Sequence, residues 1–108
     1  MDKTAKKGKT VAIIAYLTIV GCLIAITMNL EPKNPFSRFH IRQAFGIHVL
    51  YHVLAIALSY LGMAWAAIVL FLVYLLIWGF GFIHAMNGKK KPLPILGDPF
   101  QKWFTFIQ

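Results

Sequence analysis

Four histidines are the residues of this chain best suited to catalysis or ligand binding: His40, His48, His52 and His84. Two of them, His48 and His52, are four residues apart, so a helix would place both imidazoles on one face. Two imidazoles at this spacing can bind zinc, copper or haem. A carboxylate usually supports such a ligand, yet the only acids are Asp2, Glu31 and Asp98, all outside the long apolar runs.

The alternative is that the imidazoles hold the fold through hydrogen bonds to Tyr51, Tyr74, Ser59 or a backbone carbonyl. We favour this interpretation and expect no cofactor, with His48 and His52 kept as the candidates for a metal site. Proton transfer or pH sensing stays open, since the intrinsic pKa of histidine is about 6.5. The chain has no serine–histidine–acid set, phosphate-binding glycine loop or paired carboxylates, so we expect no enzyme activity and no catalytic residues.

The composition indicates that these residues belong to a small integral membrane protein of one domain. Of its 108 residues, 59% are hydrophobic and 13% are charged, and the mean hydropathy is +0.70. So few charges cannot cover the surface of a soluble domain. Beside long uncharged runs, the net charge of +8 favours anionic lipid headgroups over nucleic acid as a partner. The single cysteine, Cys22, excludes a disulfide framework and a zinc cluster.

The hydropathy pattern predicts an all-α membrane protein with three transmembrane helices, at 11–30, about 43–61 and about 64–86. The first run lacks a small-x-small cleavage site, so we expect a retained anchor rather than a signal peptide. The break at Gly62-Met63 is so short that the second and third spans must form an antiparallel hairpin.

The C-terminus adds an amphipathic helix that is too short to span the bilayer. Its apolar residues recur at i, i+3, i+4 and i+7: Phe100, Trp103, Phe104 and Ile107. We expect this helix to lie flat in the interface. The chain then divides into a basic tail at 1–10, a three-span transmembrane domain at 11–88 and a basic, amphipathic segment at 89–108.

With three spans the termini lie on opposite sides of the membrane. The side of the N-terminal tail carries four lysines, and the side of the first loop and C-terminus carries seven lysines and arginines. The positive-inside rule then places the first loop and the C-terminus in the cytoplasm and the N-terminus outside.

The stretch that enters the second span is the candidate contact site. Asn34 can cap a helix and Pro35 suits its first turn, with Arg38 and Arg42 on one face. We expect His40 and Gln43 to tie this stretch to the end of the third span. The residues predicted to contact lipid headgroups or a partner are Arg38, Phe39, His40, Arg42, Gln43, Lys89, Lys90, Lys91 and Trp103.

Two motifs, "NPFSRFHIRQAFG" at 34–46 and "GFIHAMNGKKKPLPILGD" at 81–98, followed by "FQKWFTFI", carry a resemblance. The chain resembles a family of small bacterial membrane proteins of unassigned function, often labelled import-component-like. These are similar to the twenty-kilodalton channel-type subunit of the chloroplast inner-envelope protein translocon. The matching positions are Phe39, His40, Arg42, Gln43, Ala44, Ala85, Gly88, Lys91, Pro92, Pro94, Gly97 and Asp98.

The resemblance implies a multi-pass protein of the bacterial inner membrane that serves a protein-translocation or envelope complex. We expect a non-enzymatic accessory or assembly subunit with a membrane-protein partner or further copies of itself. Three helices leave no pore wide enough for a polypeptide, so a conduit would need several copies or a larger partner. The alternatives are a homo-oligomeric channel or transporter with a histidine-bearing path, and a metal- or haem-binding membrane subunit.

Overall fold

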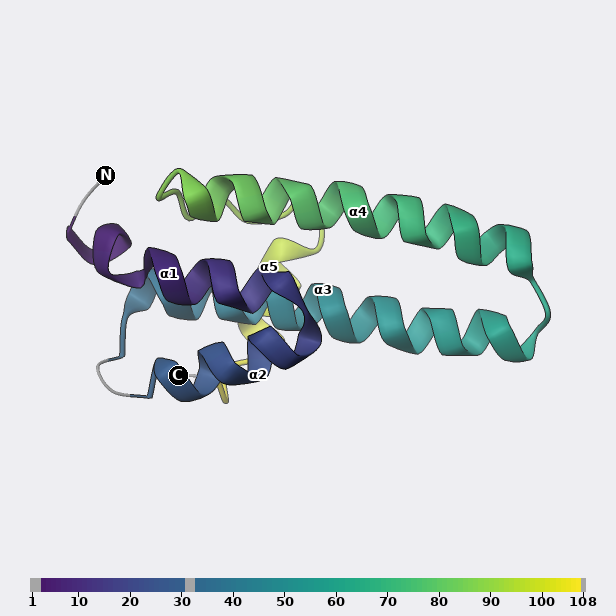
Figure 1. The fold of residues 1–108 in the computed structure, drawn as a ribbon, viewed down its shortest axis with the longest axis horizontal. Coiled ribbons are helices and arrows are strands. Elements are labelled where there is room, and N and C mark those ends of the chain that lie inside the picture. The colour runs from purple at the N-terminus through teal and green to yellow at the C-terminus, as the bar shows by residue number, and fades with distance from the viewer. Residues whose placement is uncertain (1–2, 31–32, 108) are drawn as a thin grey trace.

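A computed structural model describes residues 3–30 and 33–107, and over these ranges the chain is helical, without strands. The helices are α1 (Lys3–Leu17), α2 (Ile19–Met28), α3 (Pro35–Tyr60), α4 (Ala64–Met86) and α5 (Gly97–Trp103) (Figure 1). The all-α class is therefore confirmed. Two of the three acids, Asp2 and Glu31, lie outside the described residues, as do Pro32 and Gln108.

The longest feature is the antiparallel hairpin of α3 and α4, which runs the length of the molecule (Figure 1). Asn34 caps α3 as predicted, because its side chain accepts a hydrogen bond of 3.0 Å from the amide of Ser37, with Pro35 following at the first turn. Gly62 makes the turn to α4 with a φ of +69°, a conformation that glycine adopts without strain. Both helices are long and apolar enough to cross a membrane.

The predicted first span at 11–30 is wrong, because the run breaks at Thr18 and folds back on itself. Thr18 is extended (φ −154°, ψ 172°), and its hydroxyl accepts a hydrogen bond of 3.0 Å from the amide of Gly21, which caps α2. A side chain on Gly21 would collide with the carbonyl oxygen of Ile14, so glycine allows the close return. The described residues thus contain two candidate spans rather than three.

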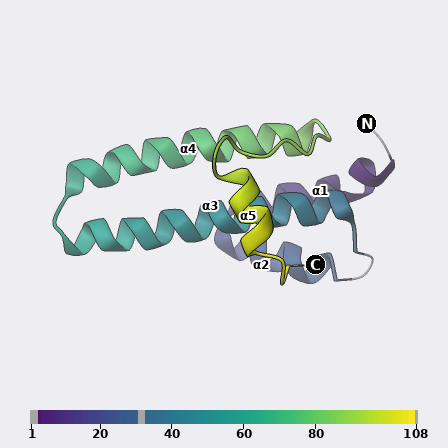
Figure 2. The same ribbon diagram turned by 180° about the vertical axis from the view of Figure 1, so that it is seen from behind.

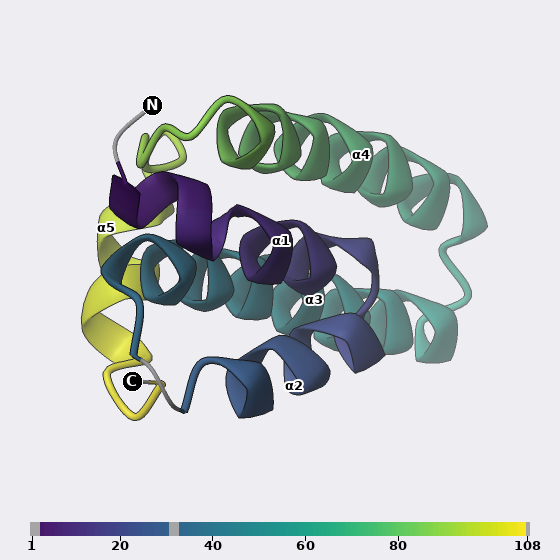
Figure 3. The same ribbon diagram turned by 60° about the vertical axis from the view of Figure 1, so that its left-hand side comes forward.

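Small residues let the α1–α2 hairpin pack closely on α3 and on the end of α4 (Figures 2 and 3). Fully buried alanines, Ala12 and Ala15 in α1 and Ala25 in α2, fill the contact. Two short helices packed against the α3–α4 hairpin thus take the place of the single spanning helix predicted at 11–30. The part of α1 beyond its lysines, residues 11–17, is only about 10 Å long at 1.5 Å per residue.

The break also moves the N-terminal tail. Asn34 Nδ2 donates to the Thr4 carbonyl oxygen at 2.9 Å, and Ser37 Oγ donates to the Gly8 carbonyl oxygen at 2.9 Å. The start of α1 therefore lies beside the start of α3 (Figure 3). This arrangement differs from the expectation that the N-terminal tail and the first loop lie on opposite sides of the membrane, because it brings both to the same end of the molecule.

The last helix, α5, lies across α3 at the level of Gly46 (Figure 2). Two residues of its predicted apolar face, Phe100 and Ile107, are 3% and 1% exposed. Trp103, by contrast, is 69% exposed. Gly46 is required here because any larger residue would collide with the Phe100 ring. Much of the apolar face of α5 thus packs on protein.

Candidate functional site: a buried polar network

Tyr16 of α1 is the centre of a polar network in an otherwise apolar interior. Its side chain is fully buried, and its hydroxyl lies 2.7 Å from His40 Nδ1 of α3. Gln43, one turn further along α3, donates from Nε2 to the same hydroxyl at 3.0 Å. A phenolic hydroxyl has one proton to donate and can also accept, so Tyr16 satisfies both neighbours at once.

The outer atoms of His40 and Gln43 bind the segment that follows α4. His40 Nε2 lies 2.7 Å from the Lys89 carbonyl oxygen, and the Leu93 amide donates to Gln43 Oε1 at 2.9 Å. Because the Lys89 carbonyl oxygen can only accept, the proton of a neutral His40 ring belongs on Nε2, and Nδ1 then accepts from the Tyr16 hydroxyl. The prediction that His40 and Gln43 tie the first motif to the end of α4 is confirmed.

Burial changes what these two residues can contact. His40 and Gln43 are both 0% exposed, so their side chains contact protein rather than lipid headgroups or a partner. Edge-on rings enclose His40: Phe36 at 4.8 Å and Phe39 at 5.1 Å between ring centroids. These contacts hold the imidazole in one orientation. The network therefore connects α1, α3 and residues 89–93 through buried hydrogen bonds.

A second set of polar contacts closes the break between α1 and α2. His48 Nε2 lies 3.1 Å from the Ala15 carbonyl oxygen, and Trp78 Nε1 donates to the Tyr16 carbonyl oxygen. These carbonyls belong to the last turn of α1 and have no partner within that helix. Unpaired, they would cost several kcal/mol away from water. His48 and Trp78 thus make a chain reversal tolerable inside an apolar environment.

The candidate metal ligands are engaged in the same way. His48 Nδ1 lies 3.0 Å from the Tyr74 hydroxyl, so both of its ring nitrogens have protein partners. His52 Nδ1 lies 2.6 Å from the His48 carbonyl oxygen on the turn before it. No cluster of three or more histidine, cysteine or acidic side chains that could hold a metal occurs in the described ranges. The contacts agree with the hydrogen-bonded interpretation of these imidazoles.

The positive charges gather at one end of the hairpin. Ten of the eleven lysines and arginines lie at or near the ends of α1, α3 and α4 that meet there, and the eleventh, Lys102, is on α5. Arg42 faces the C-terminal segment, with Nε donating to the Ile107 carbonyl oxygen at 3.0 Å. Lys89, Lys90 and Lys91, just after the end of α4, are all exposed. The far end of the hairpin, residues 58–67, carries no charge.

Sequence reasoning missed Tyr16, Trp78 and Thr18. Tyr16 is 24 residues before His40 and 27 before Gln43, so no local pattern connects them. The signal that was present is Thr18 three residues before Gly21, which matches a helix cap within an apolar run. Trp78 lies well inside α4, and its hydrogen bond to the Tyr16 carbonyl oxygen spans 62 residues of sequence.

Comparison with known proteins supports a membrane location. The chain is 30% identical over 81 residues to the UPF0132 membrane protein MJ1527 of Methanocaldococcus jannaschii. The match covers 73% of this chain and 58% of the relative, so the chain spans less than two thirds of that protein's length. No family model and no solved structure matches. The resemblance to the chloroplast translocon subunit gains no support and stays a hypothesis. What the comparison gives is similarity to an uncharacterised family of membrane proteins, in agreement with the two candidate spans.

Proposed function

We propose that this protein is a non-enzymatic accessory or assembly subunit of the cytoplasmic membrane, inserted by the α3–α4 hairpin and braced by the α1–α2 hairpin. The observation that carries the proposal is how the interior polar groups are used. The interior polar side chains form hydrogen bonds with one another and with backbone groups, as shown by Tyr16, His40, Gln43 and His48. Among the described residues, every buried side-chain nitrogen or oxygen has a partner. Groups fixed in this way stabilise a shape and are poorly placed to bind a substrate.

The outer surface supports insertion of the α3–α4 hairpin into lipid. Over its most apolar 18 residues α4 has a mean hydropathy of 2.6, yet little of that stretch is buried within the protein. Leu76 and Trp65, for example, are 75% and 69% exposed. Such a surface is stable in a hydrocarbon environment and costly in water.

The charges support one orientation. Ten of the eleven lysines and arginines belong to the chain segments at one end of the hairpin, and the sequence at its other end is uncharged. By the positive-inside rule, the charged end, with the N-terminal tail, the first connection and the C-terminal segment, faces the cytoplasm. Arg38 and Lys89 to Lys91 then lie at the level of anionic headgroups or of a partner's acidic surface.

A partner contact fits best at the C-terminal segment. Trp103 and Ile95 of this segment are 69% and 92% exposed, and lysines lie near them in the sequence at 91 and 102. Large apolar side chains beside cations suit the membrane interface or the surface of a membrane-protein partner. The translocation or envelope role is the specific form of this proposal and rests on the resemblance of the two motifs.

Photo-crosslinking in cells tests the partner contact. A photoreactive amino acid at Trp103 should give discrete crosslinks to one membrane protein. Trp65 is a matched control, since it is equally exposed, at 69%, but lies at the uncharged end. Crosslinking to lipid alone at both positions would contradict the accessory-subunit proposal. Recovery of the chain itself from Trp103 would favour a homo-oligomer.

One observation favours the channel alternative as second candidate. His52 is exposed on α3, one turn beyond His48, which contacts the last turn of α1. The α3 sequence that follows His52 is largely apolar. An imidazole at membrane depth usually faces protein or a water-filled path. Proton flux into proteoliposomes of the purified protein, lost on substitution His52→Leu but kept with His84→Leu, would support a homo-oligomeric path. Absence of flux in the unsubstituted protein would exclude it.

A further inference from the structure

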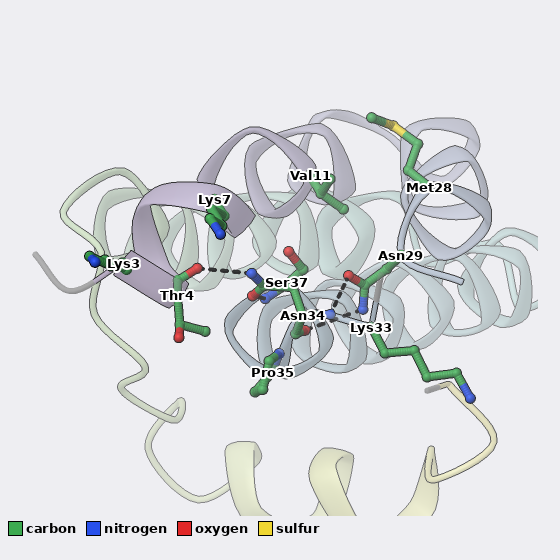
Figure 4. A pocket seen from close by; sticks show the side chains of 10 residues that line it. All are labelled: Lys3, Thr4, Lys7, Val11, Met28, Asn29, Lys33, Asn34, Pro35 and Ser37. Carbon is green, nitrogen blue, oxygen red and sulfur yellow. Dashed lines mark hydrogen bonds between the residues drawn. The ribbon is translucent and has the colours of Figure 1, made fainter. Parts of the chain in front are cut away.

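A cavity of about 300 Å³ opens between the start of α1, the end of α2 and the start of α3 (Figure 4). It lies apart from the Tyr16 network and on the charged end of the molecule. Lys3 and Lys7, one turn apart on α1, line it together with Lys33 of the first connection (Figure 4). Among the described residues no acidic side chain lines it. Lys3 and Lys7 therefore give the α1 wall of the cavity a positive charge that favours an anionic ligand.

The floor of the cavity is fixed by the contacts that join α1 to α3. The Asn34 amide group bridges the two helices, because it donates to the Thr4 carbonyl and accepts from the Ser37 amide. Gly8 lets them approach, since a side chain there would collide with Asn34 and Ser37. The site is thus built before any ligand arrives, which lowers the entropic cost of binding.

The lining changes character along the cavity. Its wall includes Val11, the first apolar residue after the lysines of α1, and Met28, the last residue of α2, which is 43% exposed. Both mark the level at which their helices pass from polar to apolar sequence. A ligand that fills the cavity therefore meets ammonium groups at one end and apolar side chains at the other.

We infer that this cavity binds the phosphate group of an anionic phospholipid, with Lys3 and Lys7 at the phosphate and the acyl chains beside Val11 and Met28. The shared chemistry with inorganic phosphate is the ammonium–phosphate contact. The apolar wall is what favours a lipid, because a free phosphate would leave it in water. The inference needs a membrane location and does not depend on which partner or complex the protein serves.

The test is lipid titration of the detergent-purified full chain, followed by native mass spectrometry. Phosphatidylglycerol should bind the unsubstituted chain at least tenfold more tightly than phosphatidylcholine, which carries no net charge. The variant Lys3→Gln/Lys7→Gln should weaken phosphatidylglycerol binding about 25-fold, because each lysine near an anionic lipid surface contributes a factor of about five. The charge-preserving variant Lys3→Arg/Lys7→Arg should bind like the unsubstituted chain.

The matched control is Lys6→Gln/Lys9→Gln, which removes the same charge from the same helix but from side chains that do not line the cavity. It should weaken binding less than threefold, an order-of-magnitude expectation for diffuse charge alone. Equal losses in the two double variants would overturn the inference in favour of a diffuse cationic surface. Displacement of the lipid by millimolar inorganic phosphate would overturn the lipid assignment and leave a phosphate site.

Discussion

The two halves of the α3–α4 hairpin are stabilised in different ways. Around the charged half, α1, α2 and α5 pack on the hairpin and bury a paired polar network. Beyond residue 52 of α3 and before residue 74 of α4, the two helices contact mainly each other, and their apolar side chains are exposed. The charged half thus has an interior of its own, and the other half depends on lipid. Substitutions in the charged half should therefore change the free energy of unfolding far more than substitutions in the lipid-exposed half.

The largest effect is expected where α4 meets Tyr16. A side chain on Gly81 would collide with the buried Tyr16 ring, whereas nothing lies within 4 Å of one on Gly79. Gly81→Ala should therefore lower the free energy of unfolding by about 3 kcal/mol through overpacking. Gly79→Ala should leave it unchanged or raise it by up to about 1 kcal/mol through helix propensity. Denaturation by SDS in mixed micelles measures both, and equal effects would argue against close packing of α1 on α4.

The polar network should be the next most sensitive feature. Tyr16→Phe removes the hydroxyl and leaves His40 Nδ1 and Gln43 Nε2 without a buried partner. The expected loss of unfolding free energy is about 2 kcal/mol. Tyr60→Phe is the control, because Tyr60 is 89% exposed at the uncharged end of the hairpin. A Tyr16→Phe variant as stable as the Tyr60→Phe variant would show that the network contributes nothing.

The break between α1 and α2 should respond less strongly. Thr18→Ala removes the hydroxyl that caps α2 at the Gly21 amide, at a cost of about 1 kcal/mol. Thr10→Ala, at an exposed position within α1, should change stability by no more than a few tenths of that amount. The same micelle titration compares the two, and a neutral Thr18→Ala would argue against the cap.

The smallest effect is expected at Ile95. Its φ of +69° is left-handed, where a β-branched side chain costs about 1 to 2 kcal/mol. Ile95→Gly should relieve this strain and, after the entropy cost of glycine, raise the free energy of unfolding by about 0.5 kcal/mol. Ile95→Ala keeps a Cβ at that φ and should gain less. Thermal unfolding in detergent measures both variants. A lower stability of both would contradict the presence of backbone strain at Ile95.

The sequence predicted those parts of the fold that depend on neighbouring residues. Asn34 and Pro35 begin α3, and Gly62 turns the hairpin, because caps and turns are read from a few adjacent side chains. The contacts of His40 and Gln43 with the segment after α4 were also predicted, from their place in the first motif.

The errors share one physical cause. Residues 11–30 are uncharged throughout, so hydropathy cannot distinguish a spanning helix from two short helices that fold back. The choice depends on distant partners: His48 and Trp78 pair the carbonyls that the break exposes, and they lie more than thirty residues away. The packing of α5 on α3 is likewise not predictable from its apolar spacing, which cannot say whether Gly46 or lipid will cover Phe100.

The most direct test of the account is where the N-terminal tail lies relative to the rest. Single cysteines at Lys6, Lys90 and Leu61, in a Cys22→Ala background, can be labelled with a membrane-impermeant maleimide in right-side-out and inverted vesicles. The fold predicts that positions 6 and 90 react from the same side and position 61 from the other. Labelling of position 6 from the side opposite to position 90 would mean that α1 and α2 cross the membrane, and would contradict the account.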